Sequence, residues 1–192
     1  EEQGIKIDWT DNLGGDFSFT QDWSYPENVI INKYGELVCD GMCDTLLDKM
    51  RDENGRIIKE SITRDYQLLD TTHHYHTLQS EAQTFAWAGT DFANADKGMN
   101  DTIICYTLCN VATHSSLELK IIGDRCFPHR KINNITNAEP EFFVCKGGNI
   151  KIDQPLFYKG IVKAEFDREF QPGKDNEPMW WKGKIYTGID SK

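Results

Sequence analysis

Three of the five histidines in this 192-residue chain lie within four positions, in the segment DTTHHYHTLQ at 70–79. If this segment is a strand, alternate side chains share a face, so His74 and His76 project together and His73 projects from the other face. Two imidazoles side by side on one strand can present two ligands to a single metal ion. Glu81 follows five residues after His76 and adds a carboxylate. These residue types and their spacing make a divalent-metal site one hypothesis for this segment.

The pattern H-x-H-x4-E formed by His74, His76 and Glu81 resembles the first metal-binding motif of the cupin family. His129, with an asparagine four residues later, resembles the end of the second motif of that family. The resemblance implies a metal-dependent β-barrel enzyme with these three residues and His129 as ligands. The family's glycine six residues before the first histidine is Leu68 here. We therefore favour the alternative, in which the histidines lie on a solvated strand face or stack on aromatic rings, and we expect no bound cofactor.

Six cysteines form the second set of residues with possible chemistry: Cys39, Cys43, Cys105, Cys109, Cys126 and Cys145. An even number at this density predicts disulfide bonds made in an oxidising compartment. The alternative is a four-thiolate zinc site built from the two C-x3-C pairs, although zinc knuckles usually have two intervening residues. Residues four apart in a strand are separated by about 13 Å, so Cys105 and Cys109 need different partners. Six cysteines allow 15 connectivities, and the sequence does not choose among them. We prefer bonds between Cys39 and Cys43 and between Cys109 and Cys126, and we expect no free thiols.

Two adjacent tryptophans, Trp180 and Trp181, are the candidate ligand-binding aromatic residues. In a strand, one of them faces the core and the other faces away from it. An exposed tryptophan on a sheet is a common platform for a sugar ring or a protein partner.

The common catalytic motifs are absent from the sequence. His114 precedes two serines, but no G-x-S-x-G elbow is present. The glycines of KGGN at 146–149 are not followed by a helical pattern, which indicates a hairpin turn and not a phosphate-binding loop. We therefore favour a binding protein over an enzyme.

The composition limits the classes of partner. The net charge is −10, with 31 acidic and 21 basic residues, which argues against binding to nucleic acid or to an anionic membrane. No apolar run has the length of a membrane-spanning helix. The chain begins at Glu1 and not at methionine, which is compatible with a processed or trimmed N-terminus. Together with the cysteines, these features predict an exported protein whose partner is a protein or a glycan.

The elements that must position these residues are mostly strands. From residue 71 onward, apolar and polar residues alternate, most clearly in 159–170, where Val162, Ala164 and Phe166 share one face. The segment 43–55 has a helical apolar stripe, and 56–70 is ambiguous but is also interpreted as a helix. These patterns predict an all-β fold, either a β-sandwich or a jelly-roll-like barrel, with one or two short helices near residues 43–69. No linker divides the chain, so we expect a single domain over residues 1–192.

The leading hypothesis is an exported, disulfide-stabilised β-sandwich that binds a protein or glycan without catalysis, in the manner of a cell-envelope or lipoprotein domain. The first alternative is the cupin-like metal-dependent enzyme. The second is an intracellular protein stabilised by zinc on four cysteines.

Overall fold

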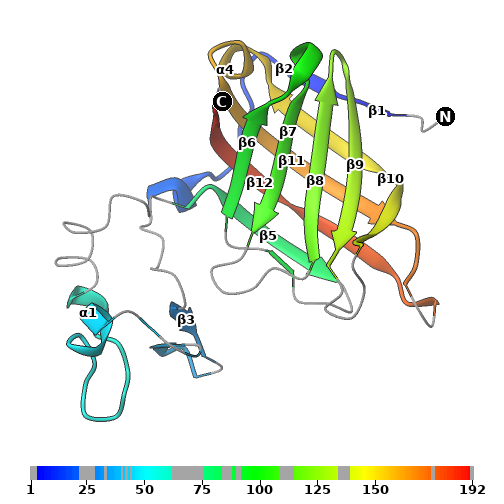
Figure 1. Cartoon of the computed structure of the whole chain (residues 1–192). Coiled ribbons are helices and arrows are strands. Elements are labelled where there is room, and N and C mark those ends of the chain that lie inside the picture. The colour runs from blue at the N-terminus through cyan, green and yellow to red at the C-terminus, as the bar shows by residue number, and fades with distance from the viewer. Residues whose placement is uncertain are drawn as a thin grey trace.

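The main body of the computed structural model is a closed β-barrel (Figure 1). The structure describes residues 4–21, 29–32, 34–39, 41, 43, 45–61, 76–83, 88–89, 92–108, 115–133, 139–173 and 176–190.

Seven strands form the barrel, and each is antiparallel to the next along the chain. They are β6 (Phe92–Lys97), β7 (Ile103–Leu108), β8 (Ser115–Ile122), β9 (Arg125–Ile132), β10 (Glu141–Asp153), β11 (Ile161–Phe170) and β12 (Met179–Asp190). Because their number is odd, the first and last strands run in the same direction, and the barrel closes through a parallel pairing of β12 with β6. The all-β prediction is confirmed, and the architecture is a barrel with the connections of a meander, not of a jelly roll.

Alternation along the strands decides which side chains fill the barrel. In β11, Val162, Ala164 and Phe166 are buried, whereas Lys163 and Glu165 between them are partly exposed. Successive side chains of a strand point to opposite faces, so one face of each barrel strand lines the interior. Each large apolar side chain removed from water contributes roughly 1.5–3 kcal/mol before entropy is counted. The interior is therefore the main source of stability.

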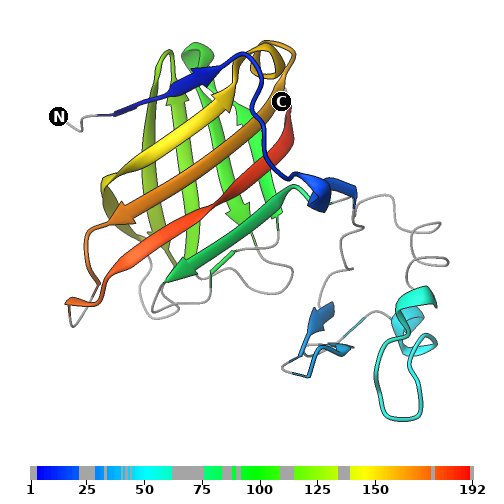
Figure 2. The same cartoon turned by 180° about the vertical axis from the view of Figure 1, so that it is seen from behind.

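The N-terminal segment fills a seam between β9 and β10. These strands pair only through residues 129–132 and 141–144. Farther along, β1 (Ile5–Lys6) takes the edge of β9, and β2 (Asp8–Thr10) pairs in parallel with the end of β10, as the blue segment in Figure 2 shows. In the same way, β5 (Leu78–Gln83) pairs with the part of β12 that β6 does not reach. β10 thus pairs along one edge with both β9 and β2, and β12 pairs along one edge with both β6 and β5.

Asp153, at the end of β10, holds the N-terminal segment in place. Its buried carboxylate accepts hydrogen bonds from the backbone N–H of Leu13 (2.9 Å) and of Leu156 (3.0 Å). The second bond caps α4 (Gln154–Tyr158). Burial raises the pKa of this carboxyl group, but the two hydrogen bonds outweigh burial and hold the pKa below its usual value.

A second, smaller hydrophobic cluster lies in the segment 29–57. The hairpin of β3 (Val29–Ile31) and β4 (Leu37–Cys39) contributes to it, together with α1 (Thr45–Asp48) and residues that follow α1. Its buried members are Val29, Leu37, Leu47, Met50 and Ile57. The cluster is small, so the disulfide bond between Cys39 and Cys43 braces a segment that has little core of its own.

The helices are shorter than the sequence predicts. The helix expected over 43–55 is the single turn α1, because Arg51 pairs with Ile57 around a turn and takes the chain out of the helix. Of the second predicted helix, the described part contains α2 (Lys59–Ser61), and residues 62–70 lie outside the described residues. The described residues also form the 3-10 helices η1 (Ser18–Gln21) and η3 (Met99–Asp101).

Gly148 is required by the close pairing of β10 with β11. Its φ is +108°, and a Cβ at this position would overlap the carbonyl oxygen of Asp167. We expect Gly148→Ala to lower the free energy of unfolding by about 2 kcal/mol, measured by urea titration. The control is Gly188→Ala, because a Cβ on Gly188 meets no atom within 4 Å. An equal effect of the two substitutions would contradict this role of Gly148.

We expect Asp153→Ala to lower the free energy of unfolding by about 1 kcal/mol at neutral pH, because a helix cap and the hydrogen bond to Leu13 are lost. Since the pKa of Asp153 is lower in the folded chain than in the unfolded chain, its stabilisation is present above the unfolded pKa and is lost as pH falls through the folded value. The difference between variant and wild type should therefore shrink in acid. Urea titrations at neutral and acid pH test this, and a constant difference would contradict it.

Candidate functional site

The outer face of β5, β12, β11 and β10 carries a shallow groove of about 600 Å³, which we call the strand groove. Its charged lining residues are Glu81, Lys151, Glu165, Asp167, Lys182 and Lys184. Opposite charges face each other across the strands, since Lys182 lies opposite both Glu81 and Asp167. The Lys182 Nζ is 3.1 Å from Glu81 Oε2. Such exposed pairs contribute little to stability, so these side chains can exchange partners for a ligand at low cost.

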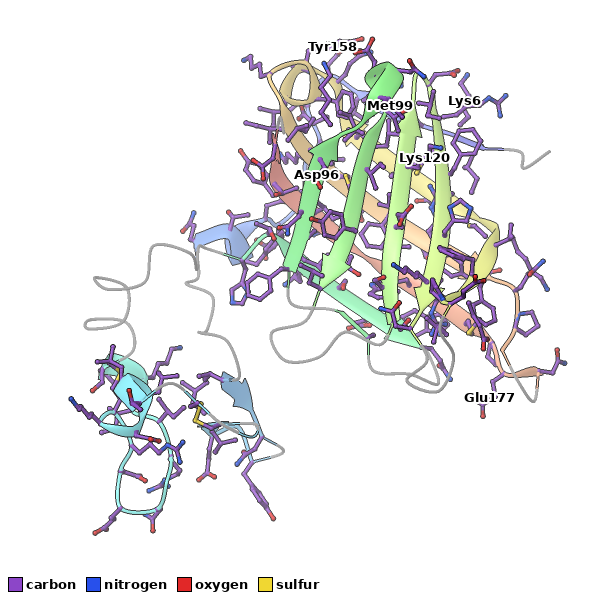
Figure 3. The ribbon with its side chains drawn as sticks, in the orientation of Figure 1. Lys6, Asp96, Met99, Lys120, Tyr158 and Glu177 are labelled. Atoms are coloured by element: carbon purple, nitrogen blue, oxygen red, sulfur yellow. A yellow bond between two sulfur atoms is a disulfide. The ribbon has the colours of Figure 1, made fainter. Side chains whose placement is uncertain are left out.

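A second hollow, of about 530 Å³, lies at the end of the strand groove, and we call it the Trp180 hollow. Its polar and aromatic lining includes Lys146, Asp167, Glu169, Asn176, Trp180 and Lys182. Trp180 lies opposite Glu169 of β11, and Lys182 Nζ is 5.1 Å from the centroid of its ring. Described residues between β11 and β12 also line the hollow, namely Pro172, Asn176 and Pro178, next to the Glu177 labelled in Figure 3. An aromatic ring with charged and amide groups around it can bind a ligand that has both an apolar face and polar substituents.

The strand groove and the Trp180 hollow form one continuous surface, because Asp167 and Lys182 line both. Together they contain four acidic and four basic side chains: Glu81, Glu165, Asp167, Glu169, Lys146, Lys151, Lys182 and Lys184. This surface is therefore charge-balanced, in contrast to the net charge of −10 of the chain. Its lining suits an uncharged, hydroxyl-rich ligand better than a strongly charged one.

The opposite end of the strand groove is bounded by the N-terminal segment. Lys184 Nζ donates a hydrogen bond to the carbonyl oxygen of Asp16 (2.9 Å) and lies 5.4 Å from the centroid of the Phe17 ring. Lys163 Nζ lies 4.8 Å from the same ring. Aromatic side chains thus stand near both ends of the groove.

The two tryptophans have different positions. Trp181 is fully buried in the barrel, and its indole N–H donates a hydrogen bond to Ser80 Oγ (3.1 Å). Trp181 is therefore not part of the outer surface that Trp180 belongs to, because its position on β12 belongs to the inward face. Trp180 faces outward and is partly exposed, as expected for one member of an adjacent pair.

The predicted metal ligands do not meet in the described part of the chain, although His73 and His74 lie outside it. His76 stacks on Phe92, with ring centroids 6.1 Å apart, and Glu81 pairs with Lys182. His129 lies on β9, separated from Glu81 on β5 by β12, β11 and β10. The described residues contain no group of three or more histidine, cysteine, aspartate or glutamate side chains able to hold a metal. Glu81 and His129 thus do not belong to one ligand set.

The cysteines follow the prediction only in part. The bond between Cys39 and Cys43 is confirmed, with their Cα atoms 5.8 Å apart, and these two residues cannot be zinc-binding thiolates. The bond expected between Cys109 and Cys126 is wrong, since Cys126 is a buried free thiol; Cys109 lies outside the described residues. Cys105 is also a free thiol, because it faces the interior from β7 and β8 separates it from β9.

Cys145 also remains a thiol in the structure, so the expectation that all six cysteines form disulfides is wrong. Its Sγ donates a hydrogen bond to the carbonyl oxygen of Gly147, at 3.1 Å. Cys105 and Cys126 instead fill the barrel core as small apolar side chains.

Sequence reasoning missed two arginines inside the barrel. Arg130 on β9 and Arg168 on β11 are both completely buried. The signal was present, because Arg168 stands between Phe166 and Phe170 at the inward phase of the alternation. Burial of a charge at such a position marks a site that needs an explanation.

No protein-family model, no curated protein and no solved structure matches this chain. Within the part of the chain that the structure describes, no helix has the length and apolarity needed to cross a membrane.

We expect the buried thiols to resist chemical labelling in the native protein. Burial raises the pKa of Cys126 to about 12 and also raises that of Cys105, so both stay protonated and shielded at neutral pH. Iodoacetamide labelling followed by peptide mass spectrometry should modify these residues in urea but not under native conditions. A native peptide pair that joins either one through a disulfide would contradict the structure.

Proposed function

We propose that this chain is an exported binding protein that holds a glycan on the outer face of its barrel, in the Trp180 hollow and the strand groove. The observation that carries the proposal is the position of Trp180. Its ring projects outward beside Glu169 and Lys182, in a hollow large enough for a sugar ring. Catalysis has no part in the proposal.

The chemistry of the surface supports a glycan. A sugar ring has an apolar face that packs on an aromatic ring and hydroxyl groups that both donate and accept hydrogen bonds. Asp167 and Glu169 supply acceptors, Lys146 supplies donors, and Asn176 supplies both. The balance of charges over the hollow and the groove favours a neutral ligand.

The shape of the surface supports an extended ligand. The groove continues the hollow along β12, from Lys182 to Lys184, and crosses four neighbouring strands. A single monosaccharide would occupy only the hollow, whereas an oligosaccharide would also contact the groove. We therefore expect the affinity to rise with the length of the glycan.

The disulfide bond between Cys39 and Cys43 supports export. Disulfides form and persist in oxidising compartments and are rare in reducing ones. The bond braces the hairpin segment and lies outside the barrel core.

The test is a glycan array with the wild-type protein, followed by calorimetric titration of the best ligand. We expect Trp180→Ala to weaken binding at least about tenfold, because a central aromatic contact is lost. The matched control is Tyr158→Ala, since Tyr158 is 76% exposed and, in Figure 3, is labelled at the other end of the barrel from Glu177. This control should bind as the wild type does.

Two outcomes would overturn the proposal. The first is an array without a bound glycan, and the second is equal affinity of Trp180→Ala and wild type. A protein partner that Trp180→Ala loses and Tyr158→Ala retains, with no glycan bound, would assign the surface to protein binding instead.

A further inference from the structure

Arg168 is a completely buried cation in the wall of the barrel. It lies on the inward face of β11, directly opposite Gly148 of β10 and Trp181 of β12. Its exposed fraction is 0%. Its neighbours on the same face of β11 are Phe166 and Phe170, which are also buried. The guanidinium is therefore removed from water and surrounded mainly by apolar side chains.

The guanidinium of Arg168 makes no hydrogen bond to any described residue. Its Nε, Nη1 and Nη2 atoms are all buried, and none of them has an acceptor there. Arg130 differs, because its Nε donates to Ser115 Oγ at 2.8 Å and its Nη1 lies 2.6 Å from Met179 Sδ. A buried charge without hydrogen bonds destabilises the folded chain, even after relaxation of the surrounding protein.

No carboxylate of the described residues hydrogen-bonds to Arg168, although the charge of Asp167 favours the charged guanidinium. The one buried carboxylate among these residues is Asp153, which already accepts two backbone hydrogen bonds. The neighbouring Asp167 and Glu169 are exposed on the outer face. Cys126 is close enough to interact electrostatically, but burial raises its pKa to about 12 despite the effect of Arg168, so it remains a neutral thiol.

Neutralisation of Arg168 itself does not solve the problem. Burial lowers the pKa of its guanidinium, but an arginine side chain starts from so high a value that it stays charged at neutral pH. The interior therefore contains a positive charge that needs a negative partner from beyond the described residues.

We propose that Arg168 is the head-group site for a single carboxylate carried by a compact apolar molecule bound inside the barrel. The planar guanidinium presents paired N–H donors that match the two oxygens of a carboxylate. The surrounding side chains are apolar or weakly polar, such as Trp181, Cys126 and Cys145, and suit an apolar body. This site lies on the opposite side of the barrel wall from the proposed glycan surface.

The backbone of β10 adds to the site. The pairing of β10 with β11 shifts register between Cys145 and Gly147, which is a β-bulge immediately beside Arg168. A bulge leaves one residue outside the regular ladder. At Gly148, which has no side chain, the backbone approaches so closely that a Cβ would lie 3.0 Å from the Arg168 Cα. The backbone of β10, with no side chain at Gly148, therefore packs directly against β11 at Arg168.

The experiment measures thermal unfolding of the full chain with sodium octanoate, sodium acetate and sodium chloride at equal ionic strength. We expect octanoate to raise the Tm of the wild type in a saturable manner, and chloride to leave it unchanged. Arg168→Met should lose the octanoate response, with affinity at least about tenfold weaker. Without ligand, its Tm should exceed that of the wild type, because an uncompensated buried charge is removed.

Two control variants separate this site from other effects. Arg125→Met removes an exposed arginine and should keep the response. Trp180→Ala should also keep it, so the failure of the glycan proposal would leave this result unaffected. If Arg168→Met does not fold, the ¹⁵N signal of the Arg168 side chain in the wild type, assigned with Arg168→Lys, should shift on addition of octanoate.

Three outcomes would overturn the proposal. They are the absence of any octanoate effect on the wild type, an equal effect on Arg168→Met, and an effect of chloride as large as that of octanoate. The last would assign the site to an inorganic anion.

Discussion

The structure depends on closure of the sheet into a barrel. Once β9 pairs with β10 and β12 pairs with β6, each barrel strand has neighbours on both edges and one face turned inward. Hydrophobic burial then acts on every second residue of the strands. The outward-facing side chains of the strands do not contribute to the core, so they are available to bind a ligand.

Where the long strands extend beyond their pairing with barrel neighbours, short segments take the remaining edges. β1 and β2 fill the seam between β9 and β10, and Asp153 joins this segment to α4 through its two hydrogen bonds. Glycines permit the closest approaches, at Gly148 between β10 and β11 and at Gly183 between β12 and β5. An unpaired backbone edge in the wall would leave polar groups without partners, and these short strands supply those partners.

The two faces of the wall have opposite electrostatic characters. On the outer face, acidic and basic side chains alternate across β5, β12, β11 and β10, and their charges balance. On the inner face, Arg130 and Arg168 are buried. The same strand, β11, thus places Asp167 in the surface groove and Arg168 in the core. Adjacent residues of a strand face opposite sides of the wall, so the charge of Asp167 is screened by water and that of Arg168 is desolvated. The two proposed binding sites lie on these two sides of the wall.

Local geometry was readable from the sequence. The period of two predicted the β architecture and showed that only one of Trp180 and Trp181 faces the core, and the short separation of Cys39 and Cys43 predicted their bond. The separation of Glu81 from His129 and the free thiol of Cys126 could not be read from the sequence, because both depend on which strands are neighbours. Only the tertiary structure decided which strands are adjacent and that no carboxylate reaches Arg168 in the described part of the chain. The physical reason is that the direction of a side chain in a strand depends only on its position relative to adjacent residues. Which strands pair depends on contacts between residues far apart in the chain.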